Sequence, residues 1–137
     1  MKMFTTIHHI GIAVRSVEQA KTVFRDVFGL RLHAEESEAE YQVRLITFQI
    51  GDIEIELLEG TGEHSPISKF IEKRGQGIHH ICFEVEDIQA ALRRLEAGGV
   101  ELIDREPRTV RQGRKVAFLQ PRTTHGVLIE LVELQKE

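Results

Sequence analysis

The chain of 137 residues has no tryptophan, one tyrosine, three prolines and a single cysteine, Cys82. One cysteine cannot form a disulfide within the chain, and no zinc-finger spacing is present. No apolar run approaches the roughly 20 residues of a membrane span, and Met1–Phe4 lacks the apolar stretch of a secretory signal. Eighteen basic and 22 acidic residues give a net charge of −4, which argues against nucleic-acid binding. We therefore expect one cytoplasmic domain with a small-molecule partner, and neither membrane nor nucleic acid.

The chain repeats itself. The segment that begins at His8-His9 resembles the segment that begins at His79-His80, 71 residues later. The ends of the two copies, Ile55–Glu59 and Ile129–Glu133, correspond at an offset of 74, and Phe48 matches Phe118 at an offset of 70. Two copies of about 70 residues are too few for a solenoid and indicate a domain with pseudo-twofold symmetry.

Each copy has the pattern of a β-α-β-β-β unit. Period-two alternation predicts strands, and apolar residues three and four apart, after a capping residue, predict one helix a copy. The expected strands are 7–14, 30–35, 41–50 and 53–59 in the first copy, and 79–85, 100–104, 114–119 and 126–133 in the second; the helices run from Ser16 to Gly29 and over 88–97.

We therefore predict an α+β fold in which residues 1–137 form a single domain. Two paired βαβββ modules, at about 5–60 and 77–134, are joined by a short linker helix at about 65–74, which begins at Ser65-Pro66. Pseudo-twofold symmetry relates the modules, and together they form a cupped mixed sheet around a metal site.

The second histidine of each pair is the functional candidate. Alternation places His9 and His80 on the strand face that also carries small residues, which leaves room in front of them. His8 and His79 lie on the bulky face, where they pack or reach the surface. Cys82 is expected to be a small buried residue on the same strand face as His80.

One carboxylate in the last strand of each copy stands among apolar residues, Glu56 in the first and Glu130 in the second. Alone, Glu56 reads more simply as a solvent-facing residue of an edge strand. Glu130 has apolar neighbours on its own face, and such a charge is costly to bury unless it is paired or binds a metal. Because the repeat relates the two positions, His9, Glu56, His80 and Glu130 are predicted to meet at one Co, Zn, Ni or Mn ion.

These residues resemble the vicinal oxygen chelate superfamily, which includes the glyoxalases, bleomycin resistance proteins and extradiol dioxygenases. Within it the chain is most similar to the methylmalonyl-CoA epimerases, in His8–Val14, Glu54–Glu59, Ser65–Ile67, Gly77–Val85, Lys115–Leu119 and His125–Leu131. Three positions depart from the epimerase pattern: Leu45 stands where some members have an acid, Gln120 where a histidine is usual, and Gly60 where a proline is common.

The resemblance implies metal ligation by His9, His80 and Glu130, with Glu56 as a ligand or near-ligand. It also implies a homodimeric isomerase that interconverts (R)- and (S)-methylmalonyl-CoA. The expected chemistry is abstraction of the α-proton of an acyl thioester to give a metal-stabilised enolate, with Glu130 or Glu56 as general base.

The basic segment from Arg105 to Lys115 is the candidate site for the phosphates of a CoA ester, and Arg114 and Lys115 are the predicted substrate-binding residues. Three alternatives stay open: a glyoxalase I-type lactoylglutathione lyase, a ring-cleaving dioxygenase, and a non-enzymatic binding protein on the same fold. The lyase's usual turns are absent, and the chain is about half the usual dioxygenase length. The sequence does not choose the metal, nor whether the site closes within one chain or across a dimer.

Overall fold

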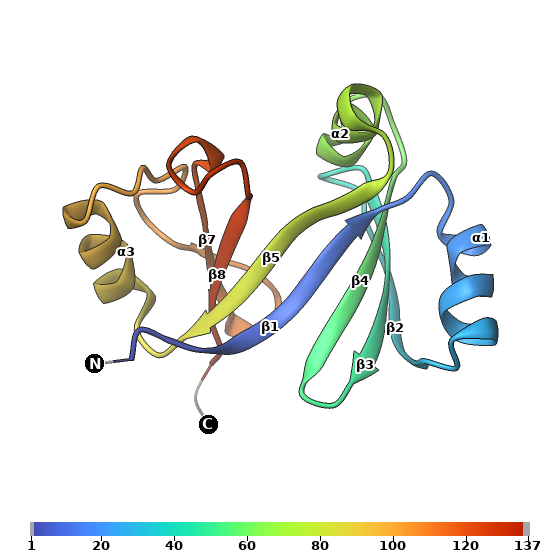
Figure 1. Cartoon of the computed structure of the whole chain (residues 1–137), viewed down its shortest axis with the longest axis horizontal. Coiled ribbons are helices and arrows are strands. Elements are labelled where there is room, and N and C mark those ends of the chain that lie inside the picture. The colour runs from blue at the N-terminus through green and yellow to red at the C-terminus, as the bar shows by residue number, and fades with distance from the viewer. Residues whose placement is uncertain (1, 136–137) are drawn as a thin grey trace. The chain divides into compact units, whose positions relative to one another are not determined.

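The computed structural model describes residues 2–135 and contains both predicted modules (Figure 1). The chain divides into two compact units, which we call the first unit, His9–His79, and the second unit, the described residues up to His8 and from His80 onward. Strand β1 (Phe4–Ala13) and strand β5 (Gly77–Val85) each contribute residues to both units. In the described part of the chain, no helix is long and apolar enough to cross a membrane.

The first unit has the strand order β2 (Arg31–Glu38), β3 (Val43–Ile50), β4 (Ile53–Gly60), β1. Strands β2 and β4 each pair antiparallel with β3, and β1 runs parallel to β4. The turn between β3 and β4 lies between the strands predicted at 41–50 and 53–59, at Gly51, whose φ of 53° is in the left-handed region that favours glycine.

The second unit has the matching order β6 (Arg108–Thr109), β7 (Lys115–Leu119), β8 (Ile129–Glu133), β5. Here too the outer strands are antiparallel and the first strand of the module, β5, runs parallel to the last, β8. The predicted α+β class and the mixed pairing of both βαβββ modules are therefore confirmed.

The helices begin where the capping residues predict. Ser16 accepts the Gln19 N–H at 3.1 Å and starts α1 (Val17–Lys21), and Asp87 accepts the Ala90 N–H at 3.0 Å and starts α3 (Ile88–Ala97). Ser65 caps the linker helix α2 (Pro66–Arg74). The apolar faces of α1 and α3 pack on the sheets of their own units, around Phe48 and Leu57 and around Leu119 and Leu131, respectively.

The first helix carries one residue more than its counterpart. Thirteen residues lie between Ser16 and Leu30, and twelve lie between Asp87 and Val100. The helix takes up the extra residue as a π-helical segment after α1, Thr22–Val27, in which the Phe28 N–H donates to the Val23 carbonyl five residues back at 2.9 Å. The insertion therefore leaves both ends of the helix in place.

One strand prediction is wrong. Residues 100–104 form no extended strand, and Leu102 makes only an isolated bridge with Leu119. The Phe118 N–H donates to the Asp104 side chain at 2.8 Å instead of to a backbone carbonyl. A continuing strand ladder would need the Phe118 N–H to donate to a backbone carbonyl. Because it donates to the Asp104 side chain, strand pairing stops at this residue, and β6 is the edge strand.

Each unit also has a glutamate that links its last strand to its helix. Glu59 Oε1 accepts the Val17 N–H at 2.8 Å, and Glu133 Oε1 accepts the Ile88 N–H at 2.9 Å. Both N–H groups belong to first helical residues, which have no partner within the helix. The two copies therefore share a hydrogen bond as well as a topology, which supports the internal repeat.

Replacing either glutamate by alanine should destabilise the fold measurably. Loss of an acceptor at a helix N-terminus costs about 1 kcal/mol, so we expect Glu59→Ala and Glu133→Ala each to lower the free energy of unfolding by about that amount in urea titrations. Glu63→Ala is the control, because its side chain is 88% exposed. Equal stability of Glu133→Ala and Glu63→Ala would contradict this role.

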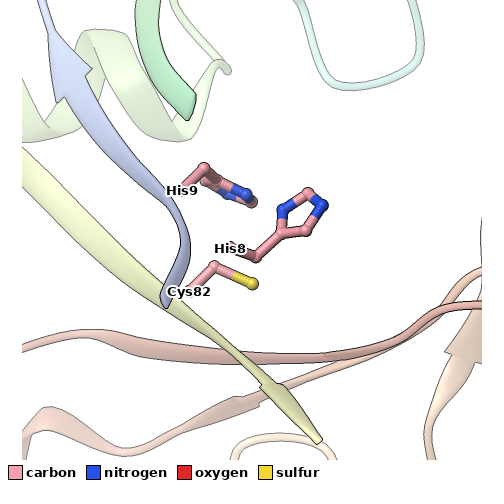
Figure 2. A group of neighbouring side chains, drawn as sticks. All are labelled: His8, His9 and Cys82. Carbon is pink, nitrogen blue, oxygen red and sulfur yellow. The ribbon is translucent and has the colours of Figure 1, made fainter. Parts of the chain in front are cut away.

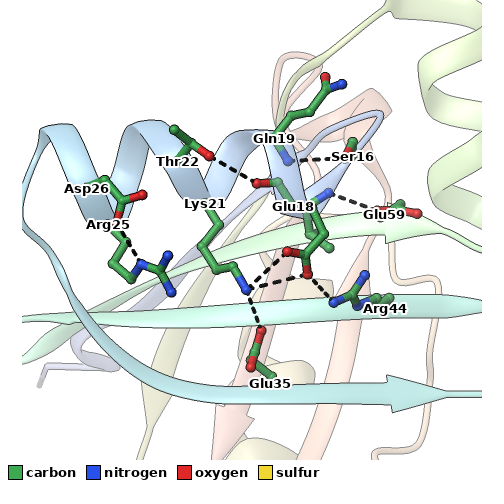
Figure 3. A network of polar contacts seen from close by, with 11 residues as sticks. Ser16, Glu18, Gln19, Lys21, Thr22, Arg25, Asp26, Glu35, Arg44 and Glu59 are labelled. Atoms are coloured by element: carbon green, nitrogen blue, oxygen red, sulfur yellow. Dashed lines mark hydrogen bonds and ion pairs between the residues drawn. The ribbon is translucent and has the colours of Figure 1, made fainter.

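The outer surface of α1 carries a network of charges (Figure 3). Lys21 Nζ lies 3.3 Å from Glu18 and 3.2 Å from Glu35, and Arg44 also pairs with Glu18. The hydrogen bond from Arg44, followed by that from Lys21, holds the pKa of Glu18 below its ordinary value of 4.5. These contacts connect the helix to strands β2 and β3.

The lowered pKa of Glu18 sets the sign of its pH dependence. A carboxyl with a lower pKa in the folded state stabilises the protein above its unfolded pKa, and this stabilisation disappears as the pH falls through the folded value. We expect Arg44→Gln to raise the pKa of Glu18 toward 4.5, measured by NMR titration. An unchanged titration curve in that variant would show that Arg44 is not the cause.

Candidate metal centre

The first unit holds a buried histidine–glutamate pair. Strand register places Gly11 of β1 beside Glu56 of β4, and His9 is two residues before Gly11 on the same face. His9 Nε2 lies 3.6 Å from Glu56 Oε1, and the two side chains are 9% and 19% exposed. Because Gly11 has no side chain, the imidazole reaches diagonally across it to the carboxylate.

The second unit builds the same pair from equivalent positions. Register places Cys82 of β5 beside Glu130 of β8, and His80 is two residues before Cys82. His80 Nε2 lies 3.3 Å from Glu130 Oε1, and the two side chains are 7% and 13% exposed. We call the sheet surface with the histidine–glutamate pair the His–Glu face of each unit.

Each pair has the chemistry and spacing of two ligands of one metal ion. Bonds of about 2.1 Å to nitrogen and oxygen, at a tetrahedral angle, place neighbouring donor atoms about 3.4 Å apart. The observed separations of 3.6 and 3.3 Å agree with that value. Two imidazoles and two carboxylates also suit a borderline divalent ion. The residues of both units therefore fit the predicted metal.

The faces differ at the strand next to the glutamate. Thr47 of β3 is opposite Glu56, whereas Phe118 of β7 is opposite Glu130. Phe48 is opposite Ile55 and so points to the helix-covered face. The predicted equivalence of Phe48 and Phe118 is therefore wrong by one residue, because Phe118 corresponds to Thr47. Each of the two strands contains one phenylalanine, and matching these two residues shifts the alignment of the copies by one position.

Lys115, one of the two predicted substrate-binding residues, lies on the opposite face of the sheet from the pair in the second unit. Lys115 is opposite Glu133, and its Nζ lies 4.0 Å from that carboxylate. Glu133 caps α3, so Lys115 is on the helix-covered face, opposite to the His–Glu face. Arg114, immediately before β7, ends the short 3-10 turn Arg111–Gly113.

The histidines that precede His9 and His80 have partners of their own. A ring nitrogen of His8 lies within 4.8 Å of the sulfur of Cys82, which is fully buried on the His–Glu face (Figure 2). Simple alternation placed His8 on the opposite face, so this contact was missed. His79 packs edge-on against Phe70 of α2 at 5.0 Å, in agreement with the packing role expected of it.

Comparison with known proteins identifies the family. The model of the Glyoxalase/Bleomycin resistance protein/Dioxygenase superfamily matches residues 8–118. The chain belongs to this superfamily. The predicted resemblance to vicinal oxygen chelate proteins, another name for it, is therefore confirmed.

Several similar proteins are named epimerases. The ethylmalonyl-CoA/methylmalonyl-CoA epimerase of Cereibacter sphaeroides is 41% identical over 96% of this chain and 100% of its own. The crystal structure of methylmalonyl-CoA epimerase from Mycobacterium tuberculosis matches with a TM-score of 0.90 and 33% identity, covering 99% of this chain and 92% of that one. A variant of the Streptomyces coelicolor methylmalonyl-CoA epimerase, in complex with 2-nitronate-propionyl-CoA, matches with a TM-score of 0.88 and 35% identity, covering 96% and 95%.

Proposed function

We propose that this protein is a methylmalonyl-CoA epimerase. The observation that carries the proposal is the pair of equivalent, buried histidine–glutamate contacts in a chain that is 41% identical to a named epimerase over nearly its whole length. A relative that binds a propionyl-CoA analogue supports a CoA ester as the substrate class.

In this proposal His9, Glu56, His80 and Glu130 hold one divalent ion, of Co, Zn, Ni or Mn. When bound, such an ion supplies positive charge that stabilises the negative charge developing on the thioester oxygen as the α-proton leaves. The internal repeat supports the shared site, because each unit offers the same two donor types from equivalent strand positions.

Two glutamates, Glu130 and Glu56, are proposed to transfer the α-proton of the substrate. Glu130 is the proposed general base that takes the α-proton of the acyl group, and Glu56 is the second carboxylate, available to return a proton to the opposite side. Return on the same side restores the original isomer, and return on the opposite side gives its epimer. Both histidines are almost completely buried, which limits the access of water to the proposed ligands.

A direct assay tests this function against the lyase alternative. The purified chain, supplied with Co²⁺, is incubated with (R)-methylmalonyl-CoA in deuterated water. We expect a mixture of the two epimers with deuterium at the α-carbon. Turnover of the methylglyoxal–glutathione adduct without α-exchange would instead identify a lyase. The cytoplasmic homodimer stays a prediction, for which light scattering and cell fractionation are the measurements.

A further inference from the structure

The two units differ in what holds the residue opposite the glutamate of the pair. In the first unit, Thr47 is opposite Glu56 and has Ala34 of the edge strand β2 as its partner on the other side. In the second unit, residues 100–104 form no extended strand, and the equivalent residue, Phe118, is bonded by Asp104. At Phe118, Asp104 therefore takes the place that an edge strand has in the other copy.

Asp104 contacts both backbone groups of Phe118. Its Oδ2 accepts the Phe118 N–H at 2.8 Å, and its own N–H donates to the Phe118 carbonyl at 3.2 Å. The Ile103 N–H donates to the same carbonyl at 2.9 Å. The Asp104 side chain is only 18% exposed, so water competes little for these bonds. Residues 103 and 104 thus hold the backbone of Phe118 at one point of β7.

Asp104 is also connected to the Phe118 ring through Arg108. A terminal nitrogen of Arg108 donates to Asp104 Oδ2 at 3.5 Å, and Arg108 Nε lies 3.5 Å from Asp104 Oδ1. The guanidinium carbon of Arg108 is 5.9 Å from the centre of the Phe118 ring, a cation–π distance. The Asp104 carboxylate therefore binds both the backbone of Phe118 and the cation that packs on its ring.

The Phe118 ring in turn contacts the imidazole of the second unit's pair. The centroids of the Phe118 and His80 rings are 6.2 Å apart and their planes meet at 75°, an edge-on arrangement. Phe118 is also opposite Glu130, whose Oε1 lies 3.3 Å from His80 Nε2. A ring that is fixed at this position limits the rotation of the imidazole and keeps Nε2 directed toward the carboxylate.

We infer that Asp104 is a positioning residue, which orients the His80 imidazole for metal binding by holding Phe118 against it. The inference deepens the proposed function and rests on it for the role of His80 as a ligand. Groups that fix the orientation of a metal-ligating histidine typically change metal affinity 10- to 100-fold. Asp104 acts through the Phe118 ring and takes no part in the proton transfer itself.

The test measures Co²⁺ binding by Asp104→Ala and Asp104→Asn. We expect Asp104→Ala to weaken Co²⁺ affinity by at least about 10-fold and to change the visible absorption spectrum of the bound ion, which reports the arrangement of its ligands. Asp104→Asn keeps an oxygen that can accept the Phe118 N–H, so it should retain most of the affinity and the wild-type spectrum. Equal losses in both variants would assign the effect to the carboxylate charge and overturn the inference.

The matched control is Glu101→Ala, which removes another arginine-paired carboxylate from the same unit. Glu101 pairs with Arg122, and its loss should leave Co²⁺ affinity and spectrum unchanged. Unfolding in urea is followed for every variant. Lower stability of Asp104→Ala with the wild-type spectrum and affinity would indicate a merely structural role and overturn the inference, as would equal spectral changes in Glu101→Ala.

A double-mutant cycle shows whether Asp104 acts through Phe118. Phe118→Leu should weaken Co²⁺ binding by itself, and Asp104→Ala in that background should add little; fully additive losses overturn the inference. Because binding is measured without turnover, the two proposals can fail separately. If the wild type shows this coupling but does not epimerise methylmalonyl-CoA, the inference stands and the proposed function falls. If the wild type epimerises and Asp104→Ala binds Co²⁺ like the wild type, the inference alone falls.

Discussion

Glu130→Gln should lower the rate at which the substrate's α-hydrogen exchanges by about 10³-fold or more. General-base catalysis alone contributes about 10²- to 10⁴-fold, and the amide has nearly the same shape as the carboxylate but cannot accept the proton. The same substitution removes an anionic donor from the pair with His80, whose Nε2 lies 3.3 Å away. Deuterium incorporation into methylmalonyl-CoA, followed by mass spectrometry at saturating Co²⁺, measures the effect.

The matched control is Glu133→Gln, three residues further along the same strand. Glu133 caps α3 on the opposite face of the sheet, so its variant should keep the exchange rate of the wild type. Exchange by Glu130→Gln at the wild-type rate would contradict the assignment of the base. Glu56→Gln completes the set, because loss of epimerisation with retained exchange would assign it the second proton transfer.

His80→Ala should weaken Co²⁺ binding by at least about 100-fold. Even outer-shell substitutions at metal sites typically cost 10- to 100-fold in affinity, and this imidazole is a proposed direct ligand. Its side chain is 7% exposed and faces Glu130. Competition with a chromophoric chelator measures the affinity, and epimerase activity should fall in parallel.

His79→Ala provides the control for that experiment within the same histidine pair. The His79 ring packs against Phe70 at 5.0 Å, so its removal should lower stability and leave Co²⁺ affinity unchanged. Wild-type affinity in His80→Ala, or equal losses in both variants, would show that the metal prediction rests on the wrong histidine.

Much of this architecture follows from sequence because the repeat imposes the same local rules twice. Ser16 and Asp87 each predict a helix start, and the structure confirms both caps. Alternation along β1 and β5 selects His9 and His80, and strand register gives each of them a glutamate on its own face. The candidate site could therefore be predicted, because its residues occupy equivalent strand positions in the two copies.

What could not be predicted depends on insertions and on contacts distant in sequence. The extra residue in the first helix could not be read from apolar periodicity, since Val23 and Val27 continue the apolar pattern but are 42% and 74% exposed in the π segment. Asp104 ends a strand by bonding the backbone of Phe118, a contact that propensity does not encode.

The number of Co²⁺ ions bound by each chain tests the account most directly. The two histidine–glutamate pairs are proposed to serve one ion, so calorimetric titration of the wild type should give one tight site per chain. His9→Ala and His80→Ala should each abolish that site. Two sites in the wild type, with one surviving in each single variant, would mean that the pairs bind independently and would contradict the shared centre on which the proposed chemistry depends.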